Sequence, residues 1–250
     1  MEAIAIHNLK KRFRLGHEKF GTIKGLLLSF NRSRYEDMQA LKGISFSVSH
    51  GETLAIIGSN GSGKSTLLSI MSRVYKPTSG EVKINGRVSA LLDLGAGFHP
   101  DLTGIENIYL NGSILGLSRR EINKRFNQIV SFAEIEHFID APLRTYSNGM
   151  VMRLGFSIAI QVDPDILLVD EVLAVGDEAF QQKCYDKVRE FQQLGKTIIF
   201  VSHDLKAVRE VATRAIWLDS GEIKADDGVE AVLEAYLQYS AENEGHPHVS

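Results

Sequence analysis

The chain has 250 residues, of which 44% are hydrophobic and 24% are charged, and its formal net charge is −3 at pH 7. This composition is typical of a globular protein, and a chain of this length can form one core or one domain with a subdomain. The net charge excludes a general attraction to nucleic acid, and no apolar run approaches the roughly 20 residues that span a bilayer. Met1–Lys10 lacks the pattern of a secretion signal. The single cysteine, Cys184, fits a reducing compartment.

Apolar runs bounded by turn residues predict alternating strands and helices. The expected strands cover residues 3–6, 40–48, 53–57, 81–84, 87–92, 165–170, 196–201, 215–218 and 222–224. The expected helices cover residues 65–71, 179–194 and 228–239, with others between 102 and 160 that include a capping box at Ser118-x-x-Glu121. The Asn85-Gly86 pair predicts a hairpin. The alternation predicts an α/β fold with a parallel sheet covered on both faces and one helical insertion.

One stretch fits the phosphate-binding pattern G-x-x-x-x-G-K-[ST]: Gly58-Ser59-Asn60-Gly61-Ser62-Gly63-Lys64-Ser65-Thr66. Its glycines let backbone N–H groups approach phosphate oxygens. Lys64 supplies a positive charge for the β- and γ-phosphates, and Ser65 offers a hydroxyl to Mg²⁺. A glycine turn followed by a chance Lys-Ser pair is the alternative. The strand expected before this loop and the helix expected after it favour nucleotide binding.

Two other apolar strands deliver polar residues at their carboxyl ends, where parallel sheets bind ligands. Ile166–Val169 leads into Asp170, a candidate Mg²⁺ ligand, and Glu171, a candidate base for an attacking water. A solvated acidic turn is the alternative for this pair. His203 follows the strand at 196–201 and could donate to the γ-phosphate, although a lone histidine is usually structural.

A Ser-containing segment precedes the helical run at 151–161. Ser147, Asn148 and Gly149 lie at the expected start of this helix, where backbone N–H groups form an anion site. A simple Ser N-cap also explains the segment. Its place 23 positions before Asp170 favours the anion site.

Together these residues resemble the nucleotide-binding domain of ATP-binding cassette (ABC) proteins over about residues 1–240. The resemblance implies a RecA-like P-loop NTPase core at 1–97 and 162–240, with an antiparallel β-subdomain. It also implies an inserted helical subdomain at 98–161, which carries the signature motif, and a tail at 241–250.

The resemblance also implies a site for ATP and Mg²⁺. Lys64, Glu171 and His203 match the catalytic residues. Ser65 and Asp170 match the metal ligands. The implied nucleotide contacts are Gly58–Thr66 in Walker A, the signature residues Ser147, Asn148 and Gly149, Asp177 in the D-loop, and Phe13 as the aromatic that stacks on adenine, with Tyr35 as a second candidate. In the family, the signature of one subunit completes the ATP site of its twin, so we expect a head-to-tail homodimer.

The departures from the family pattern point to one subfamily. The signature reads Tyr-Ser-Asn-Gly-Met instead of Leu-Ser-Gly-Gly-Gln, and the glutamine that contacts Mg²⁺ is absent from Leu91–Pro100, where Asp93 is a candidate replacement. The D-loop lacks Ser-Ala-Leu-Asp. Leu94–Pro100 and Val169–Asp177 are similar to the ATPases of bacterial exporters of lipid-linked polysaccharide: O-antigen, teichoic acid or capsule.

This subfamily implies specific partners and a location. They are a polytopic permease and a lipid-linked polysaccharide, with no nucleic acid, at the cytoplasmic face of the inner membrane. An ATPase of another ABC transporter and a soluble ABC protein are the alternatives. The sequence leaves open which polysaccharide is exported and whether a C-terminal carbohydrate-binding domain belongs to the protein.

Residues 15–37 form an insertion between the first two expected strands. Residues 10–34 carry eight basic side chains against one acidic side chain. Ile23, Leu26, Leu27 and Phe30 follow helical spacing, which predicts an amphipathic helix. This helix either packs on the domain's own core or lies at the membrane boundary with its basic residues toward anionic headgroups.

Overall fold

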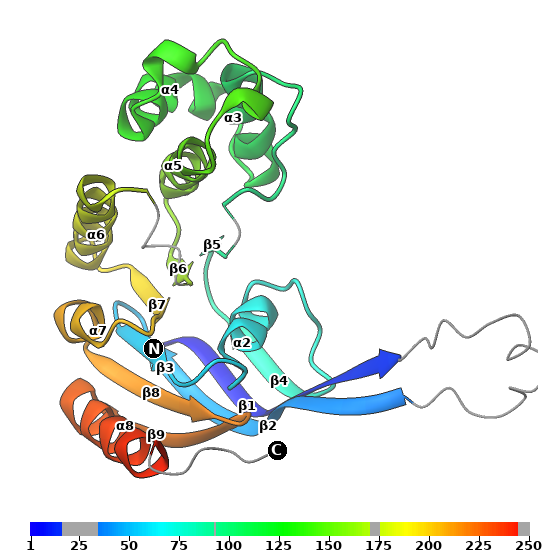
Figure 1. The fold of residues 1–250 in the computed structure, drawn as a ribbon, viewed down its shortest axis with the longest axis vertical. Helices are drawn as coiled ribbons and strands as arrows, with labels where there is room; N and C mark the ends of the chain where they lie inside the picture. Colours follow the sequence, from blue (N-terminus) through cyan, green and yellow to red (C-terminus); the bar gives the residue numbers. More distant parts are fainter. Residues whose placement is uncertain (17–34, 93, 171–175, 245–250) are drawn as a thin grey trace, which may run out of the picture.

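The computed structural model describes residues 1–16, 35–92, 94–170 and 176–244, and these form two sheets with helices around them (Figure 1). A smaller antiparallel sheet has the order β2-β1-β4, and its strands are β1 (Glu2–Gly16), β2 (Tyr35–Ser49) and β4 (Ser79–Ile84). A larger sheet has the order β5-β6-β7-β3-β8-β9, with strands β3 (Thr53–Ile57), β5 (Val88–Leu91), β6 (Ile166–Val169), β7 (Thr197–Val201), β8 (Arg214–Asp219) and β9 (Glu222–Gly228).

The larger sheet is parallel from β5 to β8, and only β9 runs antiparallel to its neighbour. Every residue of β3, β6 and β7 is buried, which explains why these strands appear in the sequence as continuous apolar runs. The α/β prediction, with a parallel main sheet and an antiparallel second sheet, is therefore confirmed.

Helices lie on both faces of the larger sheet and in a separate helical part. They are α2 (Lys64–Met71), α3 (Gly104–Ile114), α4 (Arg119–Ala133), α5 (Asn148–Ala159), α6 (Glu178–Gln193), α7 (Leu205–Val211) and α8 (Val229–Glu244). Helix α8 runs five residues beyond the helix end expected at Tyr239. None of the helices in the described ranges has the length and apolar character of a bilayer span.

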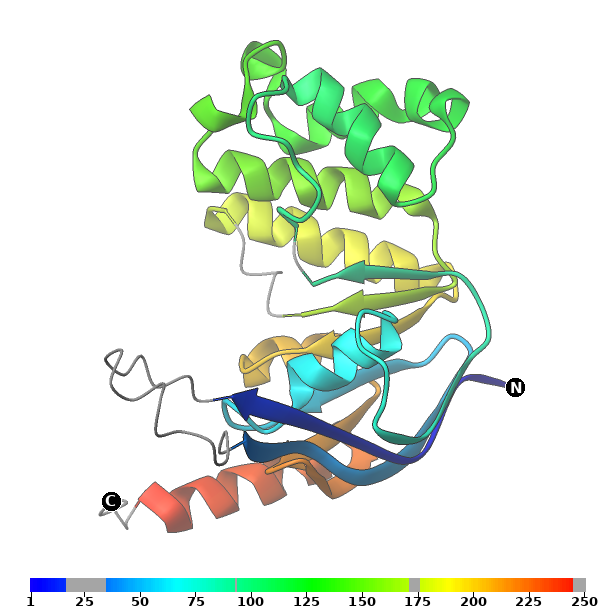
Figure 2. The ribbon, with the colours of Figure 1, turned by 90° about the vertical axis from the view of Figure 1, so that its right-hand side faces the viewer.

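Three hydrophobic clusters hold these layers together. One fills the space between the smaller sheet, α2 and one face of the larger sheet, and includes Ile4, Leu67 and Ile199. The second lies under α6, α7 and α8 on the other face, and the third is the interior of α3, α4 and α5. Figure 2 shows this order of layers, with the helical part at one end and α8 at the other.

The helical part (α3, α4 and α5) begins its helices with strong local signals. The predicted capping box at Ser118 and Glu121 is confirmed at the start of α4. A second box, which we did not predict, joins Thr103 and Glu106 at the start of α3. Each box satisfies two backbone donors that a helix leaves without partners.

The predicted Asn85-Gly86 hairpin is wrong, because β4 and β5 belong to different sheets. The Asn85 backbone N–H donates to the Ala3 carbonyl and so ends β4 in the smaller sheet. Two residues further on, the Arg87 backbone N–H donates to the Asp165 side chain, directly before β6. Gly86 (φ 140°) permits this crossing, since a Cβ at this position would lie 2.8 Å from the Cβ of Asp165. Long-range contacts therefore override a turn signal that is only local.

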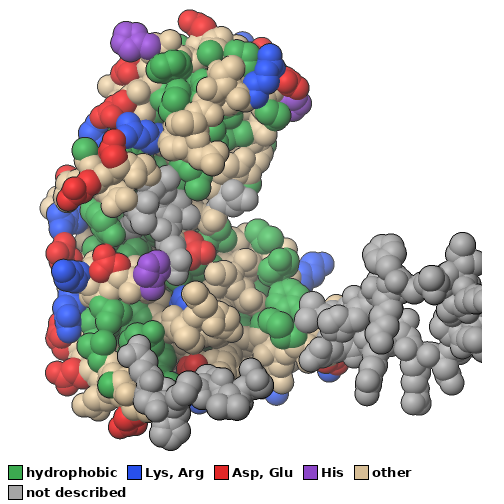
Figure 3. Space-filling view, in the orientation of Figure 1, with side chains coloured by type: hydrophobic (Ala, Val, Ile, Leu, Met, Phe, Trp, Pro, Cys, Tyr) green, Lys and Arg blue, Asp and Glu red, His purple; other side chains and the backbone are tan. Residues whose placement is uncertain are grey.

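The two ends of the predicted insertion continue the first two strands. Strand β1 extends to Gly16 and β2 begins at Tyr35, and the two pair as a ribbon that leaves the body of the molecule (Figure 1). The predicted amphipathic helix lies outside the described residues. The space-filling view shows a hollow between the helical part and the sheets (Figure 3).

Candidate functional site

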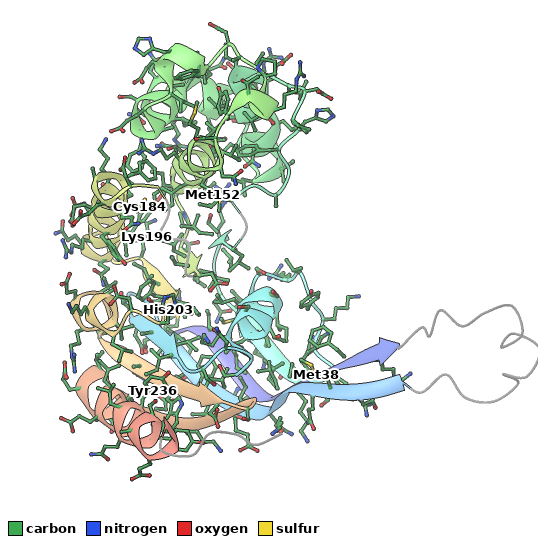
Figure 4. All side chains as sticks on the ribbon, viewed as in Figure 1. Met38, Met152, Cys184, Lys196, His203 and Tyr236 are labelled. Carbon is green, nitrogen blue, oxygen red and sulfur yellow. The ribbon has the colours of Figure 1, made fainter. Side chains whose placement is uncertain are left out.

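The ends of three neighbouring strands bring the predicted phosphate, metal and histidine positions to one edge of the larger sheet. Phe200 of β7 is level with Val169 of β6 on one side and with Ala55 of β3 on the other. The P-loop follows β3, Asp170 follows β6 and His203 follows β7, each within three residues of the strand end. All three therefore lie at the carboxyl edge of the larger sheet. Figure 4 places His203 near the end of β7.

The P-loop, residues 58–66, joins β3 to α2 and has the backbone that a phosphate cradle needs. Gly58, Gly61 and Gly63 have φ values of 146°, 79° and 110°, which side-chain-bearing residues rarely adopt. A Cβ on Gly58 or Gly63 would also collide with backbone carbonyl oxygens of Leu218 and Ala40. Glycine is therefore required at Gly58 and Gly63 both because the φ angles are positive and because no space is left for a Cβ atom.

Lys64, the first residue of α2, is only 6% exposed and its ammonium is held inside the loop. Its Nζ donates to the Gly58 and Ser59 carbonyl oxygens, both at 2.8 Å. These bonds fix the positive charge at the centre of the cradle. The start of α2 adds the positive end of the helix dipole to the same place.

The residues around this loop fit a nucleotide phosphate with Mg²⁺. Within the described part of the chain, the buried Ser62 hydroxyl has no hydrogen-bond partner, so it can donate to an oxygen of a ligand. Ser65 is exposed in the first turn of α2, and Asp170, directly after β6, is half-buried. Hydroxyl and carboxylate oxygens are the ligands that Mg²⁺ prefers, with phosphate oxygens completing its shell. In the described ranges, no group of three or more His, Cys, Asp or Glu side chains could hold a metal ion by itself. A Mg²⁺ ion at this site would therefore also need oxygen atoms of the nucleotide.

Three further residues were predicted for this site: His203, Glu171 and Asp93. His203 is exposed, directly before the Asp204 side chain that caps α7. Glu171 and Asp93 lie outside the described residues, so their predicted roles stay predictions.

The predicted anion site at the start of α5 has its own anchor. Ser147 is the N-cap, and its hydroxyl accepts a hydrogen bond from the Met150 backbone N–H at 3.2 Å. Tyr146, where the family pattern has leucine, is buried and donates its hydroxyl to the Phe138 carbonyl at 2.6 Å. Burial raises the pKa of Tyr146, so it remains a donor at neutral pH. Tyrosine therefore fixes the loop before Ser147 to the turn at Glu136–Phe138.

Ser147, Asn148 and Gly149 form the start of α5, which belongs to the helical part, while α2 lies with the sheets (Figure 1). Asn148 and Ser147 are exposed, and Gly149 is half-exposed. The helix start is thus open to a ligand presented from outside the subunit.

Asp177 lies at the start of α6, and both of its carboxylate oxygens are engaged within the chain. Oδ1 accepts from the Phe180 backbone N–H at 2.9 Å as the N-cap, and Oδ2 accepts from Arg153 at 2.6 Å. The backbone hydrogen bond, more than the charge of Arg153, lowers the pKa of Asp177. Arg153 also donates to Glu134 at 2.9 Å. Sequence reasoning missed Arg153 and Glu134, since positions 19 apart carry no shared local signal.

Phe13 lies on the β1–β2 ribbon, opposite Met38 of β2. Its ring packs edge-on against Tyr75, with centroids 5.4 Å apart, and the Lys11 ammonium lies 4.8 Å from its ring centroid. Adenine stacking on Phe13 stays a prediction. Nothing is described of the Tyr35 side chain.

Comparisons with known proteins agree with this geometry. The profile of the family described as ABC transporter matches residues 41–174. The chain is 48% identical over 231 residues to the O-antigen export system ATP-binding protein RfbB of Myxococcus xanthus, covering 90% of this chain and 53% of that protein. It is 45% identical over 242 residues to RfbB of Klebsiella pneumoniae, with 95% and 98% covered. Thus it spans about half of the first relative and nearly all of the second.

A third relative carries a different export name. The teichoic acids export ATP-binding protein TagH of Listeria monocytogenes is 43% identical over 236 residues, covering 94% of this chain and 70% of that protein. Among solved structures, a dimeric ATP-binding cassette in a post-hydrolysis state bound to ADP and Pi superimposes with a TM-score of 0.73 at 25% identity, covering 90% of this chain and 98% of that one. The chain belongs to the ABC transporter family and carries its ATP-binding domain.

Proposed function

We propose that this chain is the ATP-hydrolysing subunit of a transporter that moves a lipid-linked polysaccharide across the bacterial inner membrane from its cytoplasmic face. The convergence of the P-loop, Asp170 and His203 at one sheet edge is the observation that carries the ATPase assignment. The export names of the relatives at 43–48% identity support the polysaccharide assignment.

We assign the steps of ATP hydrolysis to different residues of this site. Lys64 neutralises charge on the β- and γ-phosphates, and the P-loop N–H groups hold them in place. Ser65 and Asp170 would hold Mg²⁺, which when bound neutralises charge that develops on the phosphate oxygens. Glu171 orients the water and accepts its proton, and His203 donates to the γ-phosphate. Catalysis is then mostly positioning and charge stabilisation.

The complete site needs a second copy of the chain. Ser147 and Gly149 lie at the start of α5 in the helical part, where the chain is exposed, whereas the P-loop precedes α2 in the part that holds the sheets. In a head-to-tail homodimer, this helix start would face the ATP held by the P-loop of the partner. The related cassette solved as a dimer with ADP and Pi supports this arrangement.

A groove of about 680 Å³ between the two parts of the chain is the surface that we assign to the permease. Val74 follows α2, Ile114 ends α3, and both are more than half exposed. Ser89 on the edge strand β5 also lines the groove, with a buried hydroxyl that has no partner in the described part of the chain. A short segment of the permease that fills this groove would contact both parts and sense their relative movement.

Two variants test the groove. Val74→Asp and Ile114→Asp should each prevent co-purification with the permease of the proposed transporter. The matched control is Leu194→Asp, because Leu194 is a similarly exposed apolar residue at the end of α6, outside the groove. Co-purification of both groove variants at the level of the control would remove the groove from the permease interface.

Activity is tested on the purified chain and in cells. Phosphate release should require ATP and Mg²⁺, fall at least 100-fold in Glu171→Gln, and leave that variant able to dimerise with ATP. Cells lacking the chain should accumulate lipid-linked polysaccharide on the cytoplasmic side of the inner membrane. The wild-type chain should restore export, and Glu171→Gln should not. Normal surface polysaccharide in such cells would reject the substrate class but leave the ATPase assignment standing.

A further inference from the structure

Tyr146, the residue directly before Ser147, is buried inside the helical part. It is only 8% exposed and belongs to the hydrophobic cluster between α3, α4 and α5. Its hydroxyl donates to the Phe138 carbonyl oxygen at 2.6 Å. The ring therefore belongs to the interior of the helical part, so any effect of Tyr146 on a ligand at the exposed start of α5 would act through the position of Ser147.

Gly104, the first residue of α3, lies against the Tyr146 hydroxyl. A Cβ on Gly104 would fall 2.4 Å from this oxygen, and its next contacts, with the side chain and the carbonyl of Ile139, would be at 2.9 Å. Gly104 does not have the positive φ that favours glycine, so its backbone angle does not require this residue. Space is the reason for glycine here. Tyrosine at position 146 and glycine at position 104 are thus matched in size.

The backbone around Ser147 is fixed on both sides. Before it, the Tyr146 N–H donates to the Leu143 carbonyl oxygen at 2.9 Å, so Tyr146 is anchored by its backbone as well as by its hydroxyl. After it, the Met150 N–H donates to the Ser147 hydroxyl at 3.2 Å. A hydroxyl that accepts a hydrogen bond in this way keeps its own proton to donate. Ser147 can therefore offer a donor, at a fixed place, to a phosphate oxygen.

We infer that Tyr146 is a positioning residue that sets the place of Ser147 for the ATP on the partner's P-loop, and that Gly104 leaves the room that the Tyr146 hydroxyl needs. The inference rests on the proposed function. Leucine, which the family pattern has at this position, fills apolar space but offers no donor to the Phe138 carbonyl. A tyrosine that only stabilised the fold would change the free energy of unfolding and leave dimerisation of the folded chain unaffected.

ATP-driven dimerisation of the full-length chain in the Glu171→Gln background tests the inference, because dimerisation needs Ser147 to meet the partner's ATP and binding of ATP to one chain does not. Tyr146→Phe removes only the hydroxyl. It should weaken dimerisation at saturating ATP at least about fivefold, the factor that one neutral hydrogen bond contributes, as measured by analytical ultracentrifugation. Equilibrium binding of ATP to the monomer, at protein concentrations below dimerisation, should stay within about twofold of the parent chain.

Two more variants show whether the effect belongs to this contact. Tyr109→Phe is the matched control, because Tyr109 also donates its hydroxyl within the helical part, to Asn123 at 2.7 Å, but neither residue adjoins Ser147 in the chain. It should leave dimerisation unchanged. Gly104→Ala disturbs the Tyr146 hydroxyl from the opposite side and should weaken dimerisation in the same direction. In the Tyr146→Phe background the added methyl group has more room, so its further effect should be smaller than in the parent chain.

The outcomes separate the inference from the proposed function. If the parent chain dimerises with ATP and folded Tyr146→Phe dimerises equally well, the inference is wrong and the ATPase assignment stands. An equal loss in Tyr109→Phe would also overturn the inference, because it would show a general loosening of the helical part. If the wild-type chain neither hydrolyses ATP nor dimerises with it, the proposed function and the inference fall together. If Tyr146→Phe does not fold, Gly104→Ala decides, and unchanged dimerisation would overturn the inference.

Discussion

Gly58 lies directly against Leu218, so closely that a Cβ on Gly58 would fall 2.0 Å from the Leu218 carbonyl oxygen. This contact joins the P-loop to β8, the neighbour of β3 in the sheet. Gly58→Ala should therefore move the loop and destabilise the fold by about 2–3 kcal/mol through the clash and the positive φ. Gly61→Ala, where φ is also positive but no atom lies within 4 Å of the added Cβ, should cost about 1 kcal/mol. Urea denaturation of both proteins checks the difference, and equal losses would contradict the contact argument.

Phe13 gives a second prediction, because its ring packs against Tyr75 as well as being the adenine candidate. If Phe13 stacks on adenine, Phe13→Ala should weaken ATP binding about tenfold, since stacking of a base on an aromatic ring contributes about 1–3 kcal/mol. Phe13→Tyr should retain affinity. Tyr75→Ala removes the same ring–ring contact without removing Phe13, so it is the control for a structural effect. Equal affinities of Phe13→Ala and wild type, measured by equilibrium binding of ATP, would exclude the stacking role.

Glu134 makes the stability of the folded protein depend on pH in the acidic range. The hydrogen bond from Lys183 is the main cause that lowers the pKa of Glu134 in the folded protein. The unfolded chain therefore binds its proton at higher pH than the folded chain does. The stabilisation is complete above the unfolded pKa of about 4.3 and is lost as the pH falls through the lower, folded value. Glu134→Gln should flatten the decrease of the urea midpoint between pH 5 and pH 3, and parallel curves for the two proteins would contradict this assignment.

Cys184 provides a probe of unfolding. It is fully buried in the cluster under α6, and burial raises the pKa of its thiol to about 12. Because the thiolate is the reactive form, a thiol reagent such as DTNB should not react with the native protein at pH 8. Labelling should begin only in the urea range where circular dichroism reports unfolding. Rapid labelling of Cys184 without denaturant would show that α6 opens locally in the native protein.

The features that the sequence predicted correctly have local causes. The glycine pattern of residues 58–66, the apolar run of β3 and the capping box at Ser118 each depend on neighbours within a few positions, and each has the predicted form. The Asn85-Gly86 hairpin failed because contacts of Asn85 with Ala3 and of Arg87 with Asp165 decide which sheet each strand joins. Arg153 was missed for the same reason, since its partners come from two other helices.

The helical part is, in topology, one long crossover between two adjacent parallel strands. Val88 of β5 pairs with Ile166 of β6, which lies 78 positions further along the chain. The pairing therefore closes a long loop, whose entropic cost grows with the logarithm of its length. Strand β5 is also at the edge of the sheet and has only four residues. It should be the last strand to join the sheet during folding and the first whose amides exchange with solvent, so the sheet assembles from its centre outward.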